Sequence, residues 1–139
     1  MIRNILAVVV GLIVGMIFNM CVVLLNTTLY PMPEGVTFED ADGTAAYFAE
    51  LPVTAFLIVI VAHVGQAFFG GLVAAVISRN AAMVVAMIVG VLSMIAGIAN
   101  MMLMPMPAWM WIELPLYLLA AYVAAQIVLA RRRAAPEAT

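Results

Sequence analysis

Long, unbroken runs of apolar residues dominate the chain and predict four membrane-spanning α-helices. The runs cover about residues 4–29, 52–78, 82–104 and 108–130. Each can cross roughly 30 Å of hydrocarbon as a helix that rises about 1.5 Å per residue. Strands of a membrane barrel would alternate polar and apolar residues, and these runs do not alternate. The pattern therefore predicts an all-α integral membrane protein with four transmembrane helices in a single membrane domain, residues 1–139.

The longest polar segment, about residues 30–51, forms the loop between the first two runs. Pro31 and Pro33 predict the end of the first helix, because proline cannot donate a backbone hydrogen bond. Apolar and aromatic residues at 45–51 predict one or two helical turns that rest on the membrane interface. Pro52 suits the first residue of the second span, where its missing N–H costs nothing.

Another proline, Pro115, affects where the fourth span is expected to begin. A helix that began at Pro115 would have only about 16 residues before Arg131, roughly 24 Å, which is shorter than the hydrocarbon core. We therefore expect the fourth helix to begin near Ala108 and to be kinked by Pro115.

Charge is scarce and is distributed unequally between the two sides of a four-span topology. Only 9% of the 139 residues are charged, against about 25% in a soluble domain. The basic residues share one side: Arg3, Arg79, Arg131, Arg132 and Arg133. The other side carries Glu34, Glu39, Asp40, Asp42, Glu50 and Glu113. The positive-inside rule predicts that both termini are cytoplasmic. The net charge of −2 gives no reason to expect nucleic acid as a partner; the expected partner is the lipid bilayer.

A weak internal repeat relates the two loops on the acidic side. Asn26 and Asn100 each precede a Pro-Met-Pro sequence by five residues. Such a repeat would give two parallel helix pairs, an arrangement found in several transporter folds. Chance similarity is the alternative, because proline and methionine are common at the ends of spans.

Small residues recur at helical spacing and predict the faces on which the helices pack, because helices in lipid associate through close backbone approach. They are Gly11, Gly15, Gly70, Gly71, Gly90, Ser93 and Gly97. The GxxxG pair Gly11 and Gly15 suits either packing within the chain or a homodimer contact. Because four short helices enclose little interior, a homo-oligomer or a larger membrane complex is expected.

A few polar residues fall within or near the spans: His63, Gln66, Asn19, Asn26, Asn100 and Gln126. The simplest interpretation is interhelical hydrogen bonding, with a neutral His63 paired to Asn19 or Asn26. The alternatives are a proton relay, a ligand contact or haem ligation at His63, or a polar path for water, ions or a small solute. No cofactor is expected, because nothing in the spacing selects a second haem ligand. Glu113 is expected at the interface, without an intramembrane charge pair.

Methionine is the one residue type in clear excess, at twelve copies. Met102, Met104 and Met106 alternate in the second loop, and thioethers suit Cu(I). Methionine also fills gaps in ordinary apolar packing. The sequence contains no set of nucleophile and base, no phosphate loop and no zinc-ligand spacing, so we do not expect an enzyme.

Several strings resemble a family of short, uncharacterised bacterial four-helix inner-membrane proteins. They are the Tyr-Pro-Met-Pro-Glu-Gly sequence at 30–35, Leu51-Pro52, Ala62-His63, Gly70-Gly71, and Trp-Ile-Glu-Leu-Pro-Leu-Tyr at 111–117. The resemblance covers most of the chain and implies a multi-pass protein of the bacterial cytoplasmic membrane. It implies no particular activity.

Two classes of function follow. The favoured one is a non-enzymatic structural or accessory subunit that acts through helix–helix association. The alternative is a small transporter or channel subunit in which His63 and the asparagines line a polar path. Cu(I) handling by the methionine cluster is a lesser alternative.

Overall fold

The computed structural model describes residues 1–134 and is an all-α bundle; residues 135–139 of the predicted membrane domain lie outside the described residues. Its elements are α1 (Ile2–Leu29), α2 (Ala41–Glu50), α3 (Val53–Ile77), α4 (Ala82–Leu103), the 3-10 helix η1 (Ala108–Glu113) and α5 (Leu114–Ala134). Within the described part, four helical stretches are long and apolar enough to cross a membrane: α1, α3, α4 and η1 with α5. The predicted fold class is therefore confirmed.

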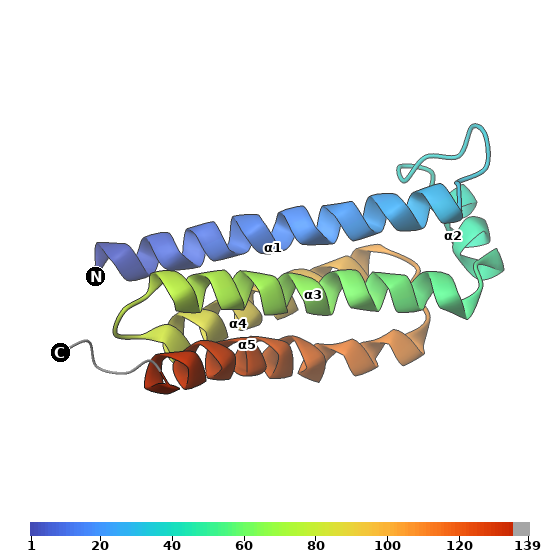
Figure 1. Ribbon diagram of the computed structural model, residues 1–139. Helices are drawn as coiled ribbons and strands as arrows, with labels where there is room; N and C mark the ends of the chain where they lie inside the picture. Colours follow the sequence, from blue (N-terminus) through green and yellow to red (C-terminus); the bar gives the residue numbers. More distant parts are fainter. Residues whose placement is uncertain (135–139) are drawn as a thin grey trace.

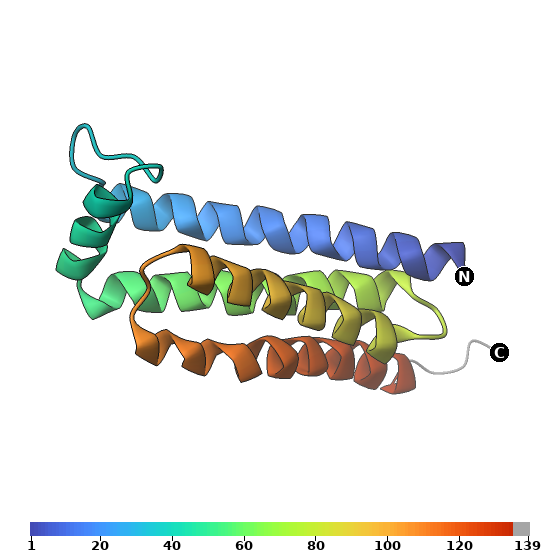
Figure 2. The same cartoon turned by 180° about the vertical axis from the view of Figure 1, so that it is seen from behind.

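The four spans run alternately up and down, so that the N-terminus and the end of α5 lie at the same end of the bundle (Figure 1). We call this the arginine end, because it carries all five arginines, and the opposite end, with residues 30–51, the acidic end. Helix α3 lies at the centre and packs against α1, α4 and α5. Figure 2 shows α4 and α5 side by side across its other face.

Small residues let the spans approach at backbone contact distance. A Cβ atom added to Gly11 of α1 would lie 2.5 Å from the carbonyl oxygen of Gly70 in α3, which leaves no room for a side chain. A Cβ atom added to Gly90 of α4 would lie 2.6 Å from the Cβ atom of Ala121 in α5. All of the small residues expected at packing faces are buried: Gly11, Gly15, Gly70, Gly71, Gly90, Ser93 and Gly97. The GxxxG pair of α1 is therefore used inside the chain, against α3.

The fourth span begins at Ala108, as expected, and its winding changes just before Pro115. Residues Ala108–Glu113 form a 3-10 helix, and α5 begins at Leu114. The kink at Pro115 stays a prediction. Pro115 lies in the first turn of α5, where a missing N–H costs nothing, and the tighter 3-10 winding precedes it.

Helix α2 lies across the acidic end of the bundle (Figure 1). Asp40 caps its N-terminus by accepting a hydrogen bond from the Gly43 amide at 3.1 Å. The Tyr47 hydroxyl ties it back to the end of α1 by donating to the carbonyl oxygen of Tyr30 at 2.6 Å. Gly35 supplies the positive φ of 82° that the preceding turn requires. The helix that the sequence predicted here is present and has ten residues.

Arginines from two neighbouring spans cap the C-terminus of α3 at the arginine end. Arg132 of α5 donates to the carbonyl oxygens of Ala75 and Val76, which the last turn of α3 leaves unpaired, at 2.8 and 3.2 Å. It also donates to the carbonyl oxygens of Ser78 and Arg79, which follow the helix, at 2.7 and 3.2 Å. Arg3 of α1 donates to the carbonyl oxygen of Ile77 at 2.6 Å. The sequence analysis used Arg3 and Arg132 only to predict the orientation of the chain in the membrane. In the structure these two side chains also connect α1 and α5 to the end of α3.

We predict that Arg132→Ala destabilises the bundle through the loss of this cap. The expected loss in the free energy of unfolding is about 1 kcal/mol, because the hydrogen bonds lie at a solvent-exposed end. Reversible denaturation in mixed micelles measures it. Arg133→Ala is the matched control, since it removes the same charge from the adjacent position, and equal losses in the two variants would show that only charge matters.

Candidate functional site: an intramembrane cavity with a histidine–glutamate floor

His63 and Glu113 form a hydrogen-bonded pair inside the bundle. His63 Nδ1 lies 3.0 Å from Glu113 Oε1 and 3.2 Å from Oε2. The Glu113 side chain is completely buried, and the His63 side chain is 12% exposed. The pair joins the middle of α3 to the junction of η1 and α5.

The winding of η1 explains why Glu113 points inward. A 3-10 helix has three residues per turn, so Met110 and Glu113 share one face, and both are fully buried. Trp109, Trp111 and Ile112 lie on the exposed side. At about 2.0 Å per residue, Glu113 lies roughly 10 Å along η1 from Ala108.

His63 reaches a matching depth on α3. At about 1.5 Å per residue it lies roughly 15 Å along α3 from Val53. Both groups therefore lie within their candidate spans and not at the ends. The 3-10 turn carries the Glu113 carboxylate inward and turns it towards α3. The position of Glu113 relative to the membrane interface stays a prediction.

Tyr117 completes the environment of the carboxylate. Its hydroxyl donates to Glu113 Oε1 at 3.1 Å from one helical turn further along α5. The Tyr117 ring stacks on the His63 ring with centroids 6.2 Å apart. Gly97 of α4 makes room for the Tyr117 hydroxyl, since a Cβ atom there would overlap it. The Glu113 carboxyl group thus accepts a hydrogen bond from Tyr117 and shares another with His63, and both side chains approach from inside the bundle.

The nitrogen of His63 that faces Glu113 is Nδ1. Among residues 1–134, the hydrogen bonds of His63 all involve Nδ1 and the Glu113 carboxyl group. The Nε2 atom has no hydrogen-bond partner among these residues. The expected pairing of His63 with Asn19 or Asn26 is wrong.

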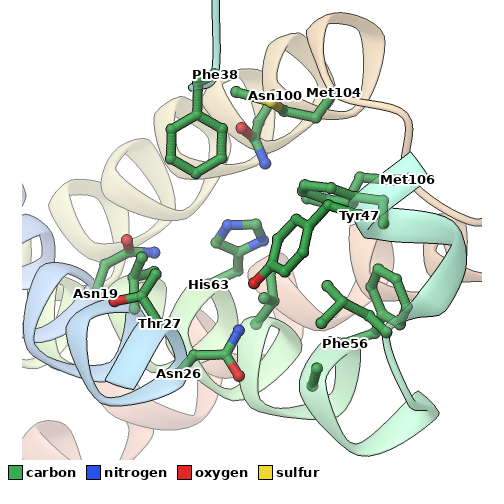
Figure 3. A pocket seen from close by; sticks show the side chains of 15 residues that line it. Asn19, Asn26, Thr27, Phe38, Tyr47, Phe56, His63, Asn100, Met104 and Met106 are labelled. Atoms are coloured by element: carbon green, nitrogen blue, oxygen red, sulfur yellow. The ribbon is translucent and has the colours of Figure 1, made fainter. Parts of the chain in front are cut away.

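A cavity of about 260 Å³ lies between this pair and the acidic end. Its polar lining comes from His63 and the amides of Asn19, Asn26 and Asn100. Aromatic side chains from the loop, α2 and α3 line the remainder: Phe38, Tyr47, Phe48 and Phe56. Figure 3 shows His63, Tyr47 and Asn26 around one space, with Phe38 and Met104 beyond them.

A second cavity of about 190 Å³ continues on the other side of His63. It is lined by Gln66, Ser93 and Tyr117, and it shares Asn19, His63 and Asn100 with the first cavity. Gln66 donates to the Ser93 hydroxyl at 3.4 Å across the α3–α4 contact. His63 therefore lines both cavities.

The structure brings together all but one of the polar residues that the sequence singled out. Asn19, Asn26, His63, Gln66 and Asn100 come from three helices and line the two cavities. Gln126 lies elsewhere and donates to the Tyr122 hydroxyl of its own helix at 2.7 Å.

Glu113 and Tyr117 are the functional candidates that the sequence reasoning missed. A signal for them existed: Met110, Glu113 and Tyr117 follow one another at steps of three and four, in register with the small residues Ala120 and Ala124 of α5. This spacing places Glu113 on the packed face of the fourth span.

The structure separates the three methionines that the sequence suggested as Cu(I) ligands. Met104 and Met106 line the larger cavity, but Met102 is 76% exposed on the outer surface, so the three thioethers do not converge there. Within residues 1–134, no group of three or more His, Cys, Asp or Glu side chains is placed to hold a metal ion.

Comparison with known proteins identifies no relative for this site. No family model matches the chain, and no curated protein or solved structure is similar to it. The resemblance to a family of short bacterial membrane proteins therefore stays a prediction, and functional inference rests on the geometry of this chain.

We predict strong energetic coupling between His63 and Glu113. Leucine at either position leaves a polar partner buried and unpaired, which costs roughly 3 kcal/mol or more. The double variant H63L/E113L removes both groups and is expected to lose less than the sum of the single variants. A double-mutant cycle by reversible denaturation measures the coupling. The control cycle pairs H63L with Q126L, whose effects should add. Additive effects of H63L and E113L would contradict a direct interaction between these two side chains.

Proposed function

We propose that this protein is a small membrane transporter or channel subunit that admits a polar solute from its acidic end to a site above the His63–Glu113 pair. The observation that carries the proposal is the fully buried Glu113 carboxylate, held by His63 beneath a cavity lined with amides. Ionisable groups at membrane depth are expensive and mark solute or proton pathways by default.

Helix association alone does not account for this arrangement. The spans already pack through glycine and alanine contacts, such as Gly11 with Gly70 and Gly90 with Ala121. Replacing a buried ion pair with apolar residues is often neutral or stabilising, so a purely structural bundle gains little from the pair. Polar side chains around two neighbouring cavities are better explained by an occupant.

The two cavities that His63 lines lie towards the acidic half. The arginine half is packed mainly through small side chains. Ala74, Ala86, Ala121 and Ala125 are all fully buried there. We propose that the acidic end faces the outside of a bacterial inner membrane and the arginine end faces the cytoplasm, following the positive-inside rule. Passage through the protein would then require movement between the α1–α3 and α4–α5 helix pairs, the motion expected if those pairs are repeats.

A structural or accessory role, in a homo-oligomer or a larger complex, is the second candidate. Its support is the large apolar surface that α1 exposes along its length, including Ile13, Ile17 and Leu24. Lipid covers such a surface equally well. The GxxxG pair gives this role no support, because Gly11 and Gly15 are buried within the chain.

We predict that the cavity is open to water from the acidic end. In a Cys21→Ser background, Asn100→Cys should react with a membrane-impermeant, positively charged methanethiosulfonate applied from that side, since the reagent needs a hydrated thiolate. Ala99→Cys is the matched control, because Ala99 lies at the same depth on the exposed surface of α4. Mass spectrometry of protein in sealed vesicles of known orientation measures the labelling.

The expected result is at least tenfold faster labelling of the Asn100→Cys variant than of the Ala99→Cys variant, blocked when the reagent has access only to the arginine end. Equal rates in the two variants would contradict an open, solute-accepting cavity. In that case the accessory role would become the leading interpretation.

A further inference from the structure

We infer that an anionic phospholipid binds in a groove between α3 and α5 at the arginine end, with its phosphate on Arg131 and Arg132. An acyl chain of the lipid follows the apolar part of the same groove. This site is separate from the cavities beside His63, and the inference does not depend on the proposed transport function. It follows from the order of apolar and cationic side chains along the groove and from the charge balance of this end of the bundle.

The groove lies on the face of the bundle where α3 and α5 run side by side (Figure 1). It is open to the outer surface and has a volume of about 340 Å³. Its lining consists of four apolar and two cationic side chains: Leu72, Val76, Ile127, Val128, Arg131 and Arg132. We call it the α3–α5 groove. It therefore offers one occupant both apolar surface and positive charge.

The apolar and the cationic side chains lie at different depths along the groove. Leu72 lies five residues, roughly 7.5 Å, before the end of α3. On α5, Ile127 lies one helical turn further into the span than Arg131. Val76 is 58% exposed, so its side chain is accessible to an acyl chain. A phospholipid has the same order of parts, because its acyl chains lie in the hydrocarbon core and its phosphate lies at the interface.

Hydrogen bonds within the protein hold Arg132 at the outer end of the groove. Its Nη2 atom donates to the carbonyl oxygens of Ala75, Val76 and Ser78, and its Nη1 atom donates to that of Arg79. These acceptors are neutral, so the guanidinium keeps its net positive charge. A guanidinium carries five N–H donors in a fork that suits phosphate oxygens. Arg132 thus places a fixed positive charge beside the more exposed Arg131.

Within residues 1–134 the protein supplies no carboxylate to balance these arginines. The only contact there between a basic and an acidic side chain joins His63 to Glu113. The acidic residues of the loop and α2, between positions 34 and 50, belong to the opposite end of the bundle. Basic side chains at the end of a span attract the headgroups of anionic lipids. A phospholipid phosphate would supply the missing counter-charge.

Two other occupants fit the groove less well. Two copies of the chain inserted in the same orientation would bring their arginine ends together, and like charges repel. A soluble anion would use Arg131 and Arg132 but not the apolar side chains further inside. An anionic phospholipid uses both parts of the groove.

Native mass spectrometry of the full-length protein, stripped of lipid in a neutral detergent, measures the binding directly. The protein is titrated with dioleoyl phosphatidylglycerol and, separately, with dioleoyl phosphatidylcholine, which has the same acyl chains and no net charge. We expect the first phosphatidylglycerol to bind at least about tenfold more tightly than phosphatidylcholine. Equal affinities for the two lipids would overturn the inference.

Two arginine variants separate a local site from a general effect of charge. Arg131→Gln removes a charge from the groove and should weaken phosphatidylglycerol binding about fivefold, without changing phosphatidylcholine binding. Arg133→Gln removes the same charge two residues away, on the opposite side of α5, and should change the affinity less than about twofold. Equal weakening in the two variants would overturn the inference.

A second pair of variants tests the apolar part of the groove. Ile127→Trp fills it and should weaken phosphatidylglycerol binding several-fold. Val91→Trp makes a similar change on the exposed surface of α4, outside the groove, and should have no effect. Equal affinities in these two variants would overturn the inference, and so would a dimer that replaces the lipid-bound monomer and that Ile127→Trp disrupts.

Glycerol phosphate distinguishes a lipid from a soluble anion. It carries the charged group of the lipid without acyl chains, and it should not displace phosphatidylglycerol at about a hundredfold excess, because the chains supply much of the affinity. Displacement at that excess would assign the site to a soluble anion and overturn the inference. The labelling of the Asn100→Cys variant tests the solute cavity independently, so the two proposals can fail separately.

Discussion

The buried contact between His63 Nδ1 and the Glu113 carboxylate is the interaction on which the rest of this structure depends. In hydrocarbon neither group is tolerable alone, so each must meet the other at the same depth and in the correct orientation. The 3-10 winding of η1 turns Glu113 inward, Tyr117 supplies a second donor, and Gly97 makes room for that hydroxyl. A change in any of these elements would move the carboxylate away from its partner.

The bundle divides into two halves with different packing chemistry. In the arginine half, glycine and alanine contacts bring the backbones together, and Arg132 caps the end of α3. In the acidic half, amides and large aromatic side chains line the cavities beside His63. The small residues therefore hold the spans together, and the larger polar and aromatic residues shape the space next to the His63–Glu113 pair.

The chemistry of the cavity follows from hydrogen bonds made elsewhere in the protein. The Tyr47 hydroxyl donates to the carbonyl oxygen at the end of α1, and His63 Nδ1 contacts the Glu113 carboxyl group. Both contacts fix elements of the acidic half. The interactions that fasten α2 and η1 to the bundle therefore also position two of the polar side chains that line the larger cavity, Tyr47 and His63.

The sequence by itself determined the four spans, the helix of α2 and the packing faces of the glycines. These features depend on the length, composition and residue spacing of single segments, which decide whether a helix can cross a bilayer and on which face it packs. It also drew attention to His63 and the asparagines. It did not reveal the partner of His63, which lies 50 residues away and on another helix. Only the tertiary structure decided that pairing, because it depends on the rotation of two spans about their axes and on a switch from 3-10 to α winding before Pro115. Neither quantity is encoded in the identity of one residue; both emerge when the helices pack.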